Sequence, residues 1–145
     1  MREVKRSALV NQPPAAVFAL INDIESYPQF LPWCTHASVQ SRSPLEIVAT
    51  IGVRHGGLRG EFTTRNALEP YCSIRMQLVS GPFRTLEGHW LLTPVQADGA
   101  DGCRVDLAMR FALRNALTGV LLEPLFASMV GSLVDAFVAR ARSRR

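Results

Sequence analysis

The spacing of apolar residues in this chain changes once, from every second residue to every third or fourth. The clearest alternating stretch is Cys103–Leu113, in which every other side chain is apolar. Near the C-terminus, apolar residues instead recur in pairs four positions apart, from Leu121-Leu122 to Phe137-Val138. Alternation is typical of antiparallel strands with one covered and one wet face, and the second spacing is typical of an amphipathic helix. We therefore expect an α+β fold in which a long C-terminal helix covers an antiparallel sheet.

Weaker signals place the other elements. An opening strand at residues 2–10, a helix beginning at Pro13-Pro14 and a short-helical connection at residues 27–33 precede the sheet. After these elements we expect a run of about six strands, of which five are placed by alternating stretches at residues 47–53, 58–64, 73–78, 86–92 and 103–113, with a turn at 98–102 before the last. Pro124 either starts the final helix or bends it. Because a long antiparallel sheet curls by its own twist, we expect a cavity between the sheet and this helix.

The composition predicts a single domain that spans residues 1–145. Of the 145 residues, 48% are hydrophobic and 19% are charged, which excludes a disordered chain and allows a sizeable core. The three cysteines lie far apart and form no CxxC pair, which favours a reducing compartment. We see no signal peptide and no apolar run long enough for a transmembrane segment. The expected location is cytoplasmic, with at most a peripheral contact with the inner membrane.

Arginine dominates the charge of this chain. The net charge of +4 equals the contribution of the C-terminal residues Arg140, Arg142, Arg144 and Arg145. This tail is either a contact for RNA or anionic lipid, or a solvated helix end whose cations complement the helix dipole, and we favour the second interpretation. The outward strand face is also predicted to be rich in arginine, which fits either cross-strand ion pairs or a nucleic-acid surface. These positions are Arg59, Arg65, Arg75, Arg104, Arg110 and Arg114.

No local motif for catalysis is present in the sequence. The three histidines, His36, His55 and His89, have no metal-ligand spacing, so we predict no metal site. The sequence contains neither a GxSxG nucleophile motif nor a glycine-rich phosphate-binding loop. We predict no catalytic residue and no catalytic cofactor, and therefore a protein that is not an enzyme.

Aromatic and apolar side chains are the candidate ligand-binding residues. They occur in every element that would border the expected cavity, although ordinary core packing explains them equally well. The candidates from the residues alone are Tyr27, Phe30, Trp33, Phe62, Phe83, Trp90, Phe111 and Phe137.

The segment Tyr27–Cys34, YPQFLPWC, resembles the YPxFLPWC motif of a START-like family. This family groups coenzyme Q-binding proteins with bacterial ribosome association toxins and also carries the label polyketide cyclase/dehydrase. The similarity continues through FTTRN at 62–66, MQLVSGPF at 76–83 and LEGHW at 86–90, and it ends with the helix residues 129–130 and 136–141. It covers essentially the whole chain.

The resemblance implies a helix-grip fold, also called START-like or Bet v-like, in which a curved antiparallel sheet wraps around a long C-terminal helix with a hydrophobic tunnel between them. It implies non-enzymatic binding of ubiquinone or a related isoprenoid lipid in support of respiration. The alternative is a ribosome association toxin that binds the large ribosomal subunit and blocks subunit joining, and the third possibility is a cyclase or dehydratase. The helix motif of the family adds Met129 and Val130, with Leu133 of the same helix, to the candidate ligand-binding residues. Arg65 and Asn66 are motif-derived candidates to orient a quinone ring, although strand alternation points Arg65 outward. The chain departs from the family pattern at Pro124 and in its final Arg-Ser-Arg-Arg sequence.

Overall fold

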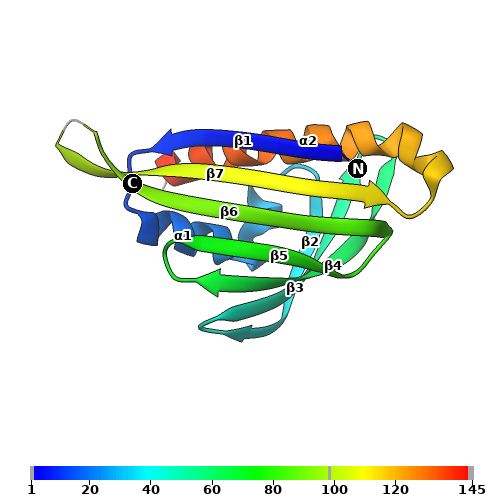
Figure 1. Cartoon of the computed structure of the whole chain (residues 1–145), viewed down its shortest axis with the longest axis horizontal. Helices are drawn as coiled ribbons and strands as arrows, with labels where there is room; N and C mark the ends of the chain where they lie inside the picture. The colour runs from blue at the N-terminus through cyan, green and yellow to red at the C-terminus, as the bar shows by residue number, and fades with distance from the viewer. Residues whose placement is uncertain (1, 98, 144–145) are drawn as a thin grey trace.

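A computed structural model describes residues 2–97 and 99–143 of the chain. In order, the elements are β1 (Arg2–Val10), α1 (Pro14–Asn22), the 3-10 helix η1 (Ile24–Gln29), β2 (Cys34–Ser43), β3 (Glu46–His55), β4 (Leu58–Glu69), β5 (Ser73–Ser80), β6 (Phe83–Ala97), β7 (Ala100–Leu113) and α2 (Ala116–Ser143). Within the described residues, seven strands form one antiparallel sheet in the order β1-β7-β6-β5-β4-β3-β2. The helix α2 lies alongside β1 and packs against the sheet (Figure 1).

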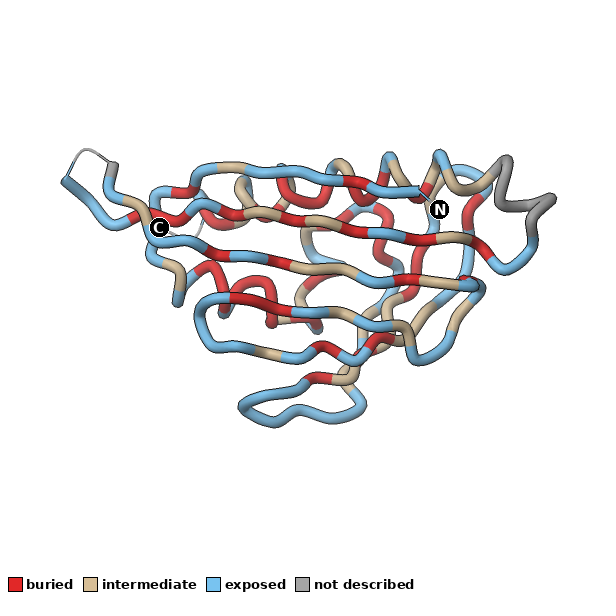
Figure 2. Tube along the Cα trace, viewed as in Figure 1, coloured by how far each residue is buried: buried red, intermediate tan, exposed pale blue. Residues whose placement is uncertain are grey.

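Alternation along the strands separates a buried face from a wet face. Buried positions alternate with exposed or half-buried ones along β7, as the colours of the trace show (Figure 2). Cys103, Val105 and Leu107 are buried, and Arg104 is exposed. The buried face of α2 closes the core from the other side with Phe126, Met129, Val130, Leu133, Val134, Phe137 and Ala141. The predicted α+β architecture, a curved antiparallel sheet with a long C-terminal helix, is confirmed.

One strand of the sheet, β2, was not placed by the sequence pattern. This strand lies at the sheet edge, and of its ten residues only Cys34 is buried. Its polar and small side chains therefore show little alternation of hydrophobicity. Two irregularities in its pairing with β3, at Cys34/His36 and Val39/Ser41, further break the period of two.

Two other boundaries differ from the predictions. The predicted turn at 98–102 is shorter in the structure, since Ala97 pairs with Ala100 and β7 begins at that residue. Gly99 has φ of 76°, a left-handed conformation that glycine adopts without strain. Pro124 does not start the last helix, because α2 begins at Ala116 and continues through the proline.

One helix segment among the described residues, Leu122–Ser143, is long and apolar enough to cross a membrane by length and composition. Core helices of soluble proteins pass the same test. In this structure α2 contributes Phe126, Val130 and Val134 to the core. The absence of a transmembrane segment therefore stays a prediction.

Candidate functional site

An enclosed cavity of about 60 Å³ lies between the inner face of the sheet and α2. Its walls come from η1 and the segment after it, from strands β3 to β7, and from the middle of α2. Of the predicted ligand-binding residues, the structure brings these to the cavity wall: Tyr27, Trp33, Phe62, Trp90, Met129, Val130 and Leu133. The site is thus assembled from segments that are distant in sequence.

Both tryptophans of the chain line this cavity. Trp33 lies in the segment that follows η1, and Trp90 lies on the interior strand β6; both are buried. The Trp90 ring meets Phe137 edge-on, with ring centroids 5.5 Å apart. Intrinsic tryptophan fluorescence therefore reports directly on the contents of this cavity.

Among the described residues, Tyr27 is the one titratable side chain on the cavity wall, and its hydroxyl group already forms a hydrogen bond. The hydroxyl donates a hydrogen bond to the carbonyl oxygen of Ile21. Burial raises the pKa of Tyr27, and the neighbouring Cys34 and Asp23 raise it further. The phenol therefore stays neutral and acts as a fixed part of the wall.

Four predicted residues lie outside the lining of the cavity: Phe30, Phe83, Phe111 and Phe137. Phe137 packs behind the wall, where its ring centroid is 5.4 Å from that of Tyr27. Phe83 and Phe111 meet Phe126 at centroid distances of 5.0 and 4.6 Å. Their expected position on the cavity wall is wrong, because these rings pack against other rings of the core: Phe83 and Phe111 against Phe126, and Phe30 and Phe137 against Tyr27.

Phe126 itself lines the cavity and was missing from the predicted site. The sequence pattern includes Leu125-Phe126 among the apolar pairs of the predicted helix. That pattern does not distinguish a residue that lines the cavity from one that only packs in the core. The other lining residues that were not predicted are Ile24, Ala49, Ile51, Thr64, Met76, Leu86 and Met109.

A buried polar pair, Thr64 and Asn66, interrupts the apolar wall. Thr64 Oγ1 donates a hydrogen bond of 2.8 Å to Asn66 Oδ1, and the two residues are only 5% and 6% exposed. Arg65 points to the wet face, where its guanidinium lies 3.5 Å from Glu46. Of the two residues suggested to orient a ligand, the structure therefore places Asn66 at the cavity and Arg65 away from it.

The floor of the cavity contains flexible side chains packed around a glycine. Strand pairing aligns Asn66, Met76, Gly88 and Met109 in one row across β4, β5, β6 and β7. A Cβ atom on Gly88 would lie 2.4 Å from the Met76 methyl carbon and 3.2 Å from that of Met109. The two methionines thus occupy the space that a side chain at position 88 would need. Since methionine adapts its shape at low cost, this floor can deform around a ligand.

The buried thiols lie outside the cavity lining. Cys34 and Cys103 are buried, while Cys72 is exposed. Burial raises the pKa of the Cys34 thiol to about 11, partly offset by its contact with the His36 carbonyl. Burial also raises the pKa of Cys103. Among the described residues, no group of three or more His, Cys, Asp or Glu side chains is placed to hold a metal ion.

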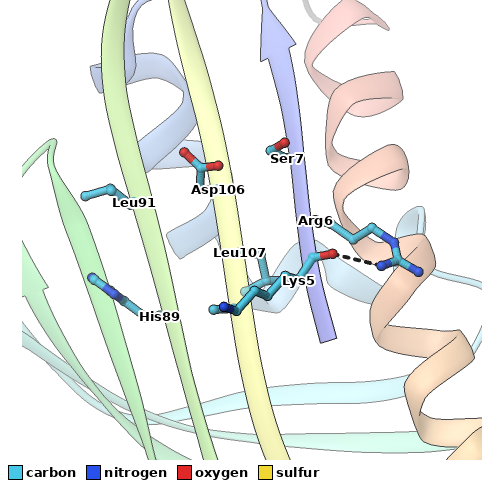
Figure 3. Close-up of a pocket in the computed structure, with 8 residues that line it drawn as sticks. Lys5, Arg6, Ser7, His89, Leu91, Asp106 and Leu107 are labelled. Carbon is cyan, nitrogen blue, oxygen red and sulfur yellow. Dashed lines mark hydrogen bonds between the residues drawn. The ribbon is translucent and has the colours of Figure 1, made fainter. Parts of the chain in front are cut away.

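A larger hollow of about 320 Å³ lies on the outer face of the sheet and is open to solvent. Figure 3 shows Lys5, His89 and Asp106 around it, on β1, β6 and β7. Burial and the nearby Arg75 lower the pKa of His89, so its imidazole is neutral at pH 7. Because the outer hollow is open to solvent and its lining includes the charged residues Lys5, Arg6 and Asp106, it is poorly suited to an apolar ligand, and the inner cavity is the better candidate site.

The family described as polyketide cyclase/dehydrase and lipid transport matches residues 10–138 of the chain. The ribosome association toxin RatA of Pseudomonas aeruginosa is 40% identical over 139 residues, which cover 96% of this chain and 94% of that protein. The RatA protein of Vibrio cholerae is 37% identical over 142 residues, covering 98% and 96%. The mitochondrial coenzyme Q-binding protein of Saccharomyces cerevisiae is 26% identical over 148 residues, covering 97% and 70%.

Solved structures give the same fold at low sequence identity. The Zhui aromatase/cyclase of a Streptomyces species matches with a TM-score of 0.84 and 18% identity, covering 99% of this chain and 94% of that chain. A START superfamily protein from Mycobacterium smegmatis matches with a TM-score of 0.75 and 19% identity, covering 99% of each. These matches confirm the predicted helix-grip fold.

Proposed function

This chain belongs to the polyketide cyclase/dehydrase and lipid transport family, as its motifs predicted, and from that premise we propose that it binds a hydrophobic ligand in the inner cavity without catalysing a reaction. The observation that carries the proposal is the cavity wall, which is apolar and aromatic except for Thr64 and Asn66. Apolar surface removed from water there would supply the binding energy, at about 25 cal/mol per Å² before association costs.

The ligand we propose is ubiquinone or a related isoprenoid lipid. The relative named as a coenzyme Q-binding protein supports this class. The cavity of about 60 Å³ is smaller than the roughly 300–1,000 Å³ typical of ligand pockets, so binding must displace side chains. Met76, Met109 and Met129 line the wall and supply the required adaptability. Because a long isoprenoid chain resides in membranes, we place this activity in the cytoplasm, with peripheral contact at the inner membrane.

The lining residues favour binding over catalysis. General acid–base chemistry needs a titratable group within reach of the substrate, and the wall holds no Asp, Glu, His, Lys or Arg side chain among the described residues. The hydroxyl of Tyr27 is bonded to Ile21 and stays protonated. The aromatase/cyclase likeness, at 18% identity, concerns the fold. A cyclase or dehydratase activity is therefore the least supported of the three functions.

Titration with decylubiquinone is expected to quench the fluorescence of Trp33 and Trp90 saturably. Met129→Glu should raise the dissociation constant at least about tenfold, since a carboxylate on the apolar wall must be desolvated when ligand binds. Leu91→Glu, on the exposed outer face, is the matched control and should bind like the parent. Circular dichroism confirms that both variants are folded, and Met129→Gln provides a neutral substitution at the same site. Equal affinity in all four proteins would exclude the cavity as the binding site.

A second candidate function, association with the large ribosomal subunit, is supported by the RatA relatives and by a group of exposed arginines. Among the residues that the structure describes, Arg54, Arg59, Arg84 and Arg114 form no ion pair. Arg54 and Arg59 are directly opposed across β3 and β4, an arrangement of like charges that costs stability. The bond from Arg114 N to the Pro82 carbonyl joins the β5–β6 turn to the end of β7. Unpaired arginines suit RNA phosphates.

Arginines of the outer face that already form ion pairs, Arg65 and Arg104, provide a control for this second candidate function. We expect the double variant Arg54→Gln with Arg59→Gln to weaken co-sedimentation with the large subunit several-fold. The slope of the logarithm of the binding constant against the logarithm of the salt concentration should become shallower by about 0.7–0.9 for each phosphate that is no longer neutralised. Arg65→Gln with Arg104→Gln removes the same charge from residues that already pair with Glu46 and Asp106, and should change little. Equal losses in the two double variants would indicate a general charge effect and contradict a defined arginine surface. Of the tail arginines, Arg140 is engaged within the protein, since it lies over the Phe30 ring, 5.0 Å from its centroid, and donates a hydrogen bond to Gln29; Arg144 and Arg145 lie outside the described residues.

A further inference from the structure

The polar pair Thr64–Asn66 lies in an otherwise apolar part of the inner sheet face. Strand pairing places Thr64 between Ala49 and Leu78, and Asn66 between Ile47 and Met76. Burying polar groups among such neighbours is unfavourable unless every donor and acceptor finds a partner. The first question is therefore which hydrogen bonds this pair makes.

Only part of the hydrogen-bonding capacity of Asn66 is used within the protein. Its Oδ1 accepts the bond of 2.8 Å from Thr64 Oγ1. Among the described residues, no group accepts a hydrogen bond from its Nδ2. The side chain belongs to a residue that is 6% exposed and that lines the cavity. The bond from Thr64 to Oδ1 fixes the orientation of the amide plane, and it leaves the two N–H donors of Nδ2 free to meet a partner in the cavity that Asn66 lines.

We propose that Asn66 donates a hydrogen bond to a carbonyl oxygen of the ligand, with Thr64 as the residue that positions the amide. The inference rests on the proposed binding function and narrows its ligand class to apolar molecules whose ring carries a carbonyl oxygen, such as a quinone or a ketone. An amide N–H pairs well with a carbonyl and finds no partner on a plain hydrocarbon. A ligand without a carbonyl oxygen would leave the buried amide without this hydrogen bond and would bind more weakly. Thr64 and Asn66 would therefore select ligands that carry a carbonyl oxygen.

Aromatic side chains on the same wall suit a flat ring. Phe62, Trp33 and Trp90 line the cavity together with Asn66. A planar ring can pack against these faces and edges while its oxygen meets the amide, since aromatic groups favour offset or edge-to-face contacts. Met76, the neighbour of Asn66 in the strand pairing, can move to admit the ring.

Duroquinone and durene test this inference, because the two molecules share a tetramethylated six-membered ring and differ in the two carbonyl oxygens. We would measure binding of both to the full chain by equilibrium dialysis, and binding of decylubiquinone by tryptophan quenching. The parent protein is expected to prefer duroquinone over durene by about tenfold, as one good hydrogen bond predicts. Asn66→Leu should abolish this preference and leave durene affinity within about twofold. Thr64→Val, which keeps the amide but removes its anchor, should reduce the preference partially.

The possible outcomes separate this inference from the proposed function. An unchanged preference in Asn66→Leu, or equal affinity of the parent for both compounds, overturns the role of Asn66 even if decylubiquinone binds. Failure of decylubiquinone to bind the parent overturns the proposed function, and the inference with it. Thermal unfolding of each variant shows whether the protein is folded, and Thr64→Val tests the same hydrogen bond if Asn66→Leu is unstable.

Discussion

Replacing Phe126 with alanine is expected to lower the free energy of unfolding by about 3–5 kcal/mol. Phe126 is 1% exposed, and its ring meets those of Phe62, Phe83 and Phe111 at centroid distances of 6.0, 5.0 and 4.6 Å. Removing it leaves a void between α2 and three strands that close packing cannot refill. A domain is stable by only about 5–15 kcal/mol, so this single change removes a large share. Urea unfolding followed by circular dichroism measures the loss.

Leu125→Ala is the matched control for this prediction. Leu125 precedes Phe126 on α2, is only partly buried, and faces the β3–β4 turn, where it lies 3.5 Å from a Cβ placed on Gly56. Its truncation should cost clearly less, about 1–2 kcal/mol. If the two variants lose the same free energy of unfolding, the contacts of Phe126 with Phe62, Phe83 and Phe111 do not stabilise the protein as predicted.

Replacing Gly88 with valine is expected to weaken decylubiquinone binding by at least about tenfold while the protein remains folded. The new side chain must displace the methyl groups of Met76 and Met109 from above the glycine. Both methionines line the cavity, so they would be pushed into the space that the ligand needs. Overpacking of this kind costs about 1–3 kcal/mol in stability, which a folded domain tolerates. Tryptophan quenching gives the affinity, and urea unfolding gives the stability.

Ala108→Val adds a similar volume on the opposite face of the same sheet region. Ala108 pairs with His89 and lines the open outer hollow, so its enlargement should leave ligand affinity unchanged. Normal binding in Gly88→Val, or an equal loss in Ala108→Val, would show that the methionine-lined floor does not limit access to the cavity.

The strands with buried faces were predictable because a period of two links sequence directly to side-chain direction. Cys103–Leu113 alternates without interruption, and its pairing with β6 and β1 follows that pattern. The edge strand β2 gave no such signal, since nine of its ten residues are not buried. The inward direction of Phe62 and Thr64 was likewise contained in the alternation of β4, and the same period extends to Asn66.

The sequence alone determined the fold, the family and the set of inward-facing residues, because these depend on periodicity and on a contiguous motif, both of which are local. It did not determine which inward residues line the cavity. Phe83, Phe111 and Phe137 are buried as Trp90 is, but they lie outside the cavity lining. Phe83 and Phe111 pack against Phe126, and Phe137 packs against Trp90. The row of Asn66, Met76, Gly88 and Met109 joins four strands through their register. Such a site exists only after the sheet has paired and α2 has packed on it, since its shape depends on distances between segments that the chain order does not specify.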